Sequence, residues 1–365
     1  MHKVLIDLGT TNIVIQLYDV SSSTVVSEVT ITNPQRRYGA DVISRIDAAN
    51  HGKLIELSSI VRKAIFEHLL QLPITELSEI LIAGNPTMIH ILMGYDCTSL
   101  GEFPYHSSHL NLIHTTAYEL ELCNAQTYTI PDSCVKLPNH TIDAHTPVCI
   151  LPGLAGFIGG DVIAGILYTN MYRQSDISIL IDLGTNGELV IGNQEQLLVT
   201  STAIGPAFDG YKGKYGTELL SEIERLIQEH RIDPTGYLLD YEQDTSLKSL
   251  QHEIRDIQLA KAALRAGLEI LVRTYGVTWE QISSIYVAGA FGLHLDLGVA
   301  IRIGLLPNLP FVQYQFIGNS SLLGLQHASK FDEWNHMEFI KSIATEVILA
   351  NESDFQDLYL QYMYF

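Results

Sequence analysis

Two copies of one short stretch decide the fold expected for this chain: Leu5-Ile6-Asp7-Leu8-Gly9-Thr10 and Leu180-Ile181-Asp182-Leu183-Gly184-Thr185. In each copy an apolar run, typical of a buried strand, reaches an aspartate and then a turn rich in glycine, threonine and asparagine. A second strand pattern follows at residues 13–17 and 188–191. Each copy therefore predicts a β-hairpin with a polar tip.

The surroundings of the two hairpins repeat as well. Apolar stripes of helical spacing follow at Leu57, Ile60, Val61, Ala64 and Ile65, and again at Leu259, Ala262, Ala263 and Ala266. Each stripe precedes an apolar strand that ends in Ala-Gly, at Gly84 and at Gly289. The same three elements in the same order predict an α/β protein of two lobes that arose by internal duplication.

The two repeats differ in length, because the second one carries extra residues between its hairpin and its Ala-Gly strand end. We expect a first lobe over residues 1–150, with an insertion at about 101–147, and a second lobe over 151–330, with an insertion at about 210–253. The remaining residues, 331–365, are expected to form a C-terminal helical segment that packs on the first lobe.

Composition excludes two classes of partner. A net charge of −20 and a pI near 5.0 would repel a phosphate backbone, so no nucleic acid is expected. Residues 148–168 are long and apolar enough to suggest a membrane span. Pro152 and five glycines interrupt that stretch, so we expect no contact with a membrane.

The four cysteines are Cys97, Cys123, Cys134 and Cys149, and no two have the spacing of a zinc or iron–sulfur site. The histidines at 90, 106, 109 and 114 show no metal-ligand spacing either. The cysteine spacing therefore predicts no iron–sulfur cluster. Since the N-terminal residues enter a strand pattern directly, we expect a cytoplasmic protein with reduced thiols.

The repeated loops have the chemistry of a phosphate site. Glycine lets backbone N–H groups approach a phosphate closely, and threonine and asparagine add donors. An aspartate at the end of a buried strand is costly unless it meets a cation, which favours Mg²⁺ at Asp7 and Asp182. A single copy would favour an ordinary tight hairpin in which the aspartate caps the turn. Two copies in a duplicated setting favour ATP.

Further residues complete the expected site. Glu188 is placed to orient an attacking water, although a solvated strand residue would fit its position as well. Gln35 and Asp41 are expected to face the γ-phosphate. Residues 287–292 offer a wall of small residues for the base. The expected catalytic residues are Asp7, Asp182, Glu188 and Gln35. The expected ATP contacts are Gly9, Thr10, Thr11, Asn12, Gly184, Thr185, Asn186, Gly187, Gly205, Gly289, Ala290, Phe291 and Gly292.

Other nucleotide folds do not match. No P-loop motif is present, and a dinucleotide fold would need its glycine loop between a strand and a helix. The paired loops with a late Val287-Ala288-Gly289-Ala290-Phe291-Gly292 instead resemble the superfamily of acetate and sugar kinases, heat-shock chaperones and actin. Within it, the chain is similar to reductive activators of corrinoid proteins. The segments that carry this likeness are 33–35, 38–46, 83–88, 151–157, 182–188, 201–208 and 300–307.

The resemblance implies two actin-like (ribonuclease H-like) lobes with a nucleotide cleft between them. It also implies an ATPase that helps return an inactive Co(II) corrinoid protein to Co(I). Family members usually carry an iron–sulfur domain, so the cysteine pattern implies a separate ferredoxin-like electron donor. Residues 209–253 depart from the family pattern. A small-molecule kinase and a nucleotide-dependent assembly protein remain alternatives, and a homodimer stays open.

Overall fold

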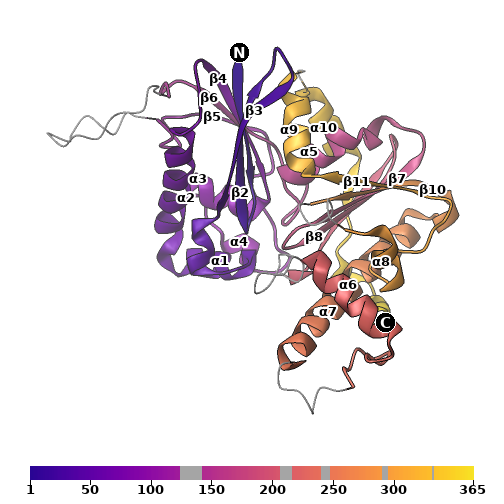
Figure 1. The fold of residues 1–365 in the computed structure, drawn as a ribbon. Coiled ribbons are helices and arrows are strands. Elements are labelled where there is room, and N and C mark those ends of the chain that lie inside the picture. Colours follow the sequence, from indigo (N-terminus) through magenta and orange to yellow (C-terminus); the bar gives the residue numbers. More distant parts are fainter. Residues whose placement is uncertain (124–141, 206–215, 240–246, 290–294, 331–332) are drawn as a thin grey trace. The chain divides into compact units, whose positions relative to one another are not determined.

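The computed structural model describes residues 1–123, 142–205, 216–239, 247–289, 295–330 and 333–365. Contacts between residues divide the chain into two compact units. Unit 1 consists of residues 1–168 and 321–341, and unit 2 consists of residues 169–320 and 342–365. The elements of both are labelled in Figure 1.

Unit 1 is built on a mixed six-stranded sheet in the order β3-β2-β1-β4-β6-β5. Its strands are β1 (His2–Leu8), β2 (Asn12–Asp19), β3 (Thr24–Thr32), β4 (Leu77–Gly84), β5 (Ile113–Thr116) and β6 (Pro147–Ile150). β1, β2 and β3 form an antiparallel meander, whereas β1, β4 and β6 run parallel. The predicted first hairpin is thus the β1–β2 pair.

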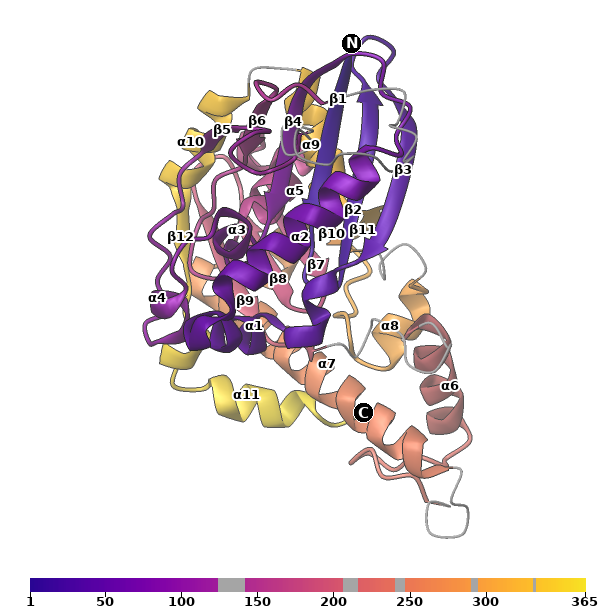
Figure 2. The ribbon, with the colours of Figure 1, turned by 90° about the vertical axis from the view of Figure 1, so that its left-hand side faces the viewer.

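Helices cover both faces of this sheet. They are α1 (Val42–Ala48), α2 (Leu54–Leu69), α3 (Pro86–Met93), α4 (Thr98–Gly101), α5 (Gly160–Thr169), α9 (Ser320–Lys330) and α10 (Trp334–Ile343), with short helical turns at Pro34–Tyr38 and Ala49–Lys53. The predicted stripe on α2 is confirmed at Leu57, Val61 and Ile65, which are fully buried in the core, whereas Ile60 and Ala64 are only partly buried. Figure 2 shows α2 lying across the sheet.

On the other face, α9 packs on β2: Gln326 donates a hydrogen bond of 2.9 Å to Gln16.

Unit 2 repeats this plan. Its sheet has the order β11-β10-β7-β8-β9-β12. The strands are β7 (Ile177–Leu183), β8 (Gly187–Gly192), β9 (Leu197–Thr202), β10 (Ile282–Ala288), β11 (Gln313–Gly318) and β12 (Ala344–Glu346). β9, β8, β7, β10 and β11 match β3, β2, β1, β4 and β6 in order and direction. The predicted duplication is therefore present in the strand topology.

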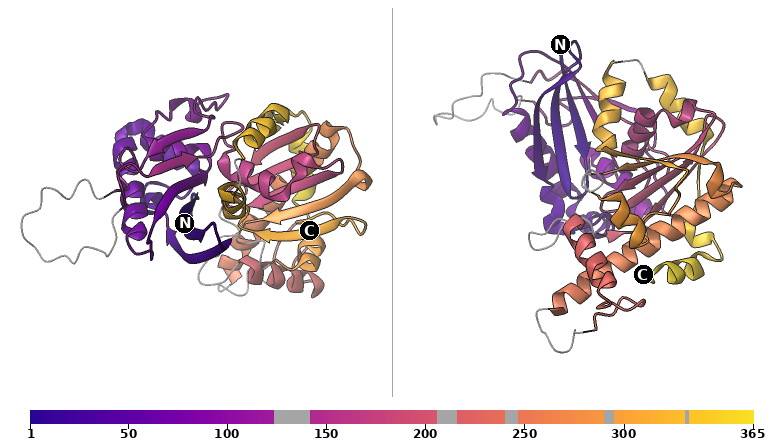
Figure 3. Two further views of the ribbon diagram at one scale, coloured as in Figure 1. Left: turned by 90° about the horizontal axis from the view of Figure 1, so that it is seen from above. Right: turned by 45° about the vertical axis from the view of Figure 1, so that its right-hand side comes forward.

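The core of unit 2 lies between its sheet and its longest helix. The helices are α6 (Gly216–Gln228), α7 (Leu247–Tyr275), α8 (Leu297–Arg302) and α11 (Phe355–Tyr362), with short turns at Met171–Arg173, Trp279–Gln281 and Leu349–Asn351. Of the second predicted stripe, Ala262, Ala263 and Ala266 are buried on α7, whereas Leu259 is 36% exposed. The right-hand view of Figure 3 shows α7 (orange) with α11 (yellow) beside it.

The C-terminal residues divide differently from the expected segment 331–365. Only those up to Lys341 belong to unit 1. Beyond them, β12 pairs in parallel with β9, and side chains of α11 pack on the core of unit 2. The expected boundary at residue 150 also moves, since unit 1 extends to Tyr168 and includes α5. Gly324 explains this grouping, because a Cβ there would lie only 2.1 Å from the carbonyl oxygen of Ala164 in α5.

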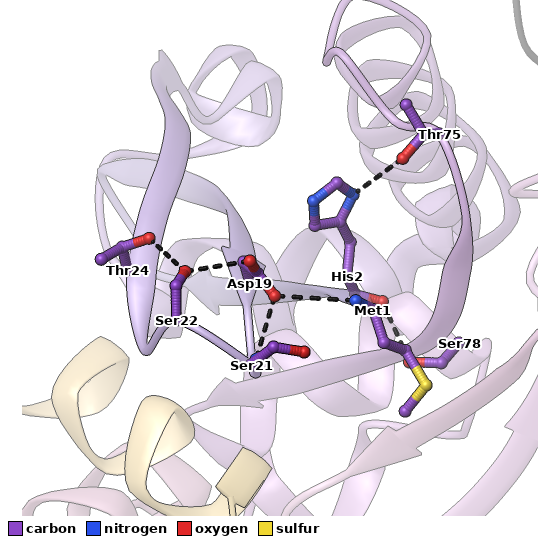
Figure 4. A network of polar contacts seen from close by, with 8 residues as sticks. All are labelled: Met1, His2, Asp19, Ser21, Ser22, Thr24, Thr75 and Ser78. Atoms are coloured by element: carbon purple, nitrogen blue, oxygen red, sulfur yellow. Dashed lines mark hydrogen bonds and ion pairs between the residues drawn. The ribbon is translucent and has the colours of Figure 1, made fainter.

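Short polar contacts link the strand ends of unit 1 near the start of β1 (Figure 4). The Asp19 carboxylate accepts hydrogen bonds from the Ser21 N–H and the Ser22 hydroxyl, both at 2.9 Å, which shapes the β2–β3 turn. Ser78 donates to the carbonyl oxygen of His2 at 2.9 Å and ties β4 to β1. The polar hairpin tip predicted as a ligand loop lies at the other end of β1.

Within the described ranges, every helix is either too short or too polar to span a bilayer.

Candidate nucleotide site

Hydrogen-bond donors from outside the first loop, residues 9–12, fix its backbone by binding its carbonyl oxygens. The side-chain amide of Asn33 donates to the Gly9 oxygen at 2.9 Å, and the Asn33 backbone N–H donates to the Thr11 oxygen at 2.9 Å. Arg45 donates to the Thr10 oxygen at 2.5 Å. In a trans peptide the N–H points opposite to the C=O, so the N–H groups of Thr10 and Thr11 point away from these donors. The loop is built to direct N–H groups outward.

Asn85 fixes the loop from the neighbouring strand end. Its side-chain oxygen caps α3 by accepting from the Met88 N–H at 3.0 Å, and its amide donates to the Thr10 hydroxyl at 3.0 Å. Thr87, in the first turn of α3, is fully buried, and its hydroxyl has no hydrogen-bond partner among the residues that the structure describes. The positive end of α3 and an unsatisfied hydroxyl therefore lie next to the loop.

Gln35 is also part of the loop's support. Its side chain is fully buried. The amide nitrogen donates to the Leu57 carbonyl at 3.0 Å, and the amide oxygen accepts from Arg45 at 3.3 Å. Both ends of the predicted catalytic amide are thus engaged by protein groups in this structure.

The two predicted metal-binding aspartates occupy equivalent positions in the two sheets. Asp7 lies opposite Ala83 of β4, and Asp182 lies opposite Ala288 of β10. Alternate residues of β1 and β7 enter the hydrophobic cores, so each aspartate projects from the sheet face that lies opposite α2 or α7. Both are partly buried.

Unit 2 adds a second carboxylate beside its aspartate. Glu188 lies directly opposite Asp182 in the antiparallel β7–β8 pair, so both side chains leave the same face of the sheet. In unit 1 the matching position is Val14. The hydroxyl of Ser320, at the start of α9, donates to Asp182 at 2.9 Å. The two loops therefore differ in charge, since only the second carries paired carboxylates.

The second loop turns tightly between β7 and β8. The Gly184 N–H donates to the Asn186 carbonyl at 3.0 Å, and Thr185 is 9% exposed. A Cβ at Gly187 would lie 3.1 Å from a methyl group of Thr202 on β9. Gly205, which follows β9, has a φ of +64°, a conformation that favours glycine.

The two Ala-Gly strand ends meet the loops in the same way. A Cβ at Gly84 would lie 2.8 Å from the Leu8 carbonyl oxygen, and one at Gly289 would lie 2.3 Å from the Leu183 oxygen. Leu8 and Leu183 are the matching leucines of the repeated stretch. Both glycines are therefore required by close backbone approach. The other predicted wall residues, Ala290, Phe291 and Gly292, lie outside the described residues.

Cysteine and histidine do not build a metal centre within the part of the chain that the structure describes. No group of three or more His, Cys, Asp or Glu side chains there could hold an ion. Cys97, Cys123 and Cys149 are buried free thiols, and burial raises the pKa of Cys97 and of Cys149 to about 12. Such thiols are poor ligands and poor nucleophiles. Cys134 lies outside the described residues.

Sequence reasoning missed four residues that shape the site: Asn33, Arg45, Asn85 and Ser320. Asn85 carried a readable signal, because Asn-Pro after a strand predicts a helix cap. Asn33 and Arg45 fall in a segment singled out for its likeness to a family, but nothing local showed that they contact the loop. Ser320 is 138 residues from Asp182, and only the fold brings the two together.

Two protein-family models together match almost the whole chain. Residues 3–174 match the model of the RACo middle region, and residues 176–243 and 220–365 match that of the C-terminal domain of RACo, the ASKHA domain. The chain therefore belongs to the RACo family, and the predicted pair of actin-like lobes is confirmed.

Relatives with curated names cover almost the whole chain. It is 26% identical over 432 residues to the corrinoid activation enzyme RamQ of Eubacterium limosum, which involves 99% of this chain and 70% of that protein. It is 20% identical over 424 residues to the [Co(II) methylated amine-specific corrinoid protein] reductase of Methanosarcina barkeri, at 99% and 76% coverage.

A solved structure of a reductive activator for corrinoid, iron-sulfur protein superposes with a TM-score of 0.86 and 25% identity. It covers 100% of this chain, which spans 66% of the solved chain.

Proposed function

We propose that this chain is an ATP-dependent activator that helps return a Co(II) corrinoid protein to Co(I). The observation that carries the proposal is the pair of equivalent aspartates, Asp7 and Asp182, each before a glycine loop, in a member of the RACo family. The names of the relatives supply the corrinoid partner.

The residues present fit Mg²⁺ and a polyphosphate. Two carboxylates directly opposite each other, as Asp182 and Glu188 are, repel unless a cation or proton intervenes. Mg²⁺ commonly uses one or two carboxylates and completes its shell with waters and phosphate oxygens, so it needs no cluster of three protein ligands. When bound, the ion would neutralise phosphate charge.

The chain's own residues would then act in separate roles. Loop residues 9–12 and 184–187 would donate backbone and side-chain hydrogen bonds to phosphate oxygens, with Gly205 and Gly289 allowing close approach. Glu188 would orient a water, and Ser320 would hold the orientation of Asp182. Buried thiols with raised pKa values do not compete with this chemistry.

Reduction of Co(II) to Co(I) consumes one electron, which ATP cannot supply. We therefore assign the electron to a separate ferredoxin-like donor, and assign to ATP the selection of a partner-binding state. A ligand shifts such an equilibrium only by its differential affinity for the two states. The homodimer and the cytoplasmic location stay predictions.

The test combines the purified chain with a candidate corrinoid protein, a low-potential chemical reductant and ATP. The visible absorption of the cobalt reports its oxidation state. We expect Co(I) to accumulate with ATP and not without it, and Asp182→Asn to abolish the difference. Persistent Co(II) with a chain that demonstrably binds ATP would contradict the activator role, and phosphate transfer to a small molecule would favour the kinase.

A further inference from the structure

Arg45 is a buried cation whose hydrogen-bond partners, within the described residues, are all neutral groups. Its side chain is fully buried. The guanidinium donates to the carbonyl oxygens of Thr10 at 2.5 Å and Gly39 at 3.2 Å, to the amide oxygen of Gln35 at 3.3 Å, and to the sulfur of Met88 at 3.1 Å. Burying a charge is expensive unless something compensates for it. A protein that only needed to fasten these groups could use a neutral donor.

The charge nevertheless persists at neutral pH. Burial lowers the pKa of Arg45, the carboxylate of Asp41 opposes this shift, the nearby positive Arg36 adds to it, and together they bring the pKa to about 10. Asp41 itself is committed to capping α1, since it accepts from the N–H and the hydroxyl of Ser44, both at 2.8 Å. Its attraction offsets part of the cost without forming an ion pair with Arg45.

The position of the Arg45 charge indicates which kind of ligand it would attract. Arg45 bonds directly to the Thr10 carbonyl, so a positive charge lies immediately behind a loop whose N–H groups point outward. The α3 N-terminus, capped by Asn85, adds its positive dipole end to the same loop through the Thr10 hydroxyl. All three contributions favour an anion in front of the loop.

We propose that Arg45 is a positioning residue whose buried positive charge, acting through the Thr10 peptide, sets the affinity of the first loop for the polyphosphate of the nucleotide. This inference rests on the proposed function, since it takes the ligand to be ATP. Gln35 has a role through Arg45: its neutral amide holds the guanidinium without cancelling the charge. A glutamate there would cancel it.

Two variants at Gln35 separate charge from packing, because replacing Arg45 itself would remove four hydrogen bonds. Gln35→Met keeps the approximate size of the side chain but loses both the bond to the Leu57 carbonyl and the oxygen that accepts from Arg45. Gln35→Glu loses the bond to the Leu57 carbonyl, keeps an acceptor for Arg45 and adds a negative charge beside it. A third variant, Asp41→Asn, keeps a good helix cap and removes a negative charge. Calorimetric titration with ATP, ADP and adenosine, in the same buffer with Mg²⁺, measures the affinities.

We expect Gln35→Glu to bind ATP about tenfold more weakly than Gln35→Met, ADP a few-fold more weakly, and adenosine equally well, because Coulomb interaction scales with ligand charge. Asp41→Asn should bind ATP about threefold more tightly than the unmodified chain. A purely structural Arg45 predicts that Gln35→Glu, which keeps an acceptor for Arg45, binds ATP at least as tightly as Gln35→Met, and that result would overturn the proposal. Failure of the unmodified chain to bind ATP would instead overturn the proposed function.

Discussion

Gly289→Ala tests how much stability depends on the close approach of the β10 strand end to the second loop. Gly289 has a φ of +98°, and an added Cβ would lie 2.3 Å from the Leu183 carbonyl oxygen. The left-handed conformation costs an L-residue roughly 1–2 kcal/mol. Because the contacting atom belongs to the backbone of a central strand, relief requires a shift of the sheet, which costs about 1–3 kcal/mol. We expect Gly289→Ala to lower the free energy of unfolding of unit 2 by about 3 kcal/mol in total.

Gly276→Ala is the matched control. Gly276 has a φ of +81° after the end of α7, and an added Cβ there would meet nothing within 4 Å. It carries the conformational cost alone, about 1 kcal/mol. Both substitutions reduce the entropy of the unfolded chain equally, so this effect cancels in the comparison. The difference of about 2 kcal/mol is roughly a 30-fold change in the unfolding equilibrium.

Tryptophan fluorescence can report on unit 2 alone, because each unit contains one of the two tryptophans. Trp334 lies in unit 1 and Trp279 lies in unit 2. In a Trp334→Phe background, urea unfolding followed by tryptophan fluorescence reports on unit 2. This avoids treating a two-unit protein as one transition. Equal midpoints for Gly289→Ala and Gly276→Ala would refute the backbone-contact argument.

Three further predictions concern single side chains. Ser320→Ala removes the hydrogen bond to Asp182 and should weaken Mg²⁺-dependent ATP binding about fivefold, measured by titration at several Mg²⁺ concentrations; an unchanged Mg²⁺ dependence would count against it. Asn85→Ala loses the cap on Met88 and should destabilise unit 1 by about 1–2 kcal/mol in urea, whereas Asn85→Asp should lose much less. Burial lowers the pKa of Lys261 to about 8, from 10.5 for an ordinary lysine, so the unfolded chain binds more protons between these values. Native stability should therefore rise from pH 8 to 10.5, by at most about 3 kcal/mol, and Lys261→Met should remove that rise from pH-dependent unfolding curves.

The local parts of this protein were readable from the sequence, and the contacts between distant parts were not. Periodicity and turn chemistry located both hairpins and α2, and repetition indicated two lobes. Burial was harder to predict, since Leu259 belongs to an apolar stripe and is still 36% exposed. The predicted orientation of Gln35 toward a ligand did not include Arg45, because a side chain's partner across ten residues depends on how the intervening helix packs.

The division of the C-terminal residues shows the same limit. Nothing in the composition of residues 331–365 marks the point at which the chain passes from one unit to the other. That point depends on β12 finding the free side of β9, which is a property of the completed sheet.

The division of unit 1 into residues 1–168 and 321–341 has a consequence for synthesis on the ribosome. The Ala164 backbone of α5, which closely meets Gly324 of α9, is made more than 150 residues before its partner. Domains generally begin to fold as they emerge, N-terminal first. Here the first domain to emerge stays incomplete until almost all of the second has been translated, so one face of β2 waits exposed for Gln326. The nascent chain therefore passes through a long interval in which chaperones have a defined face of the first sheet to protect.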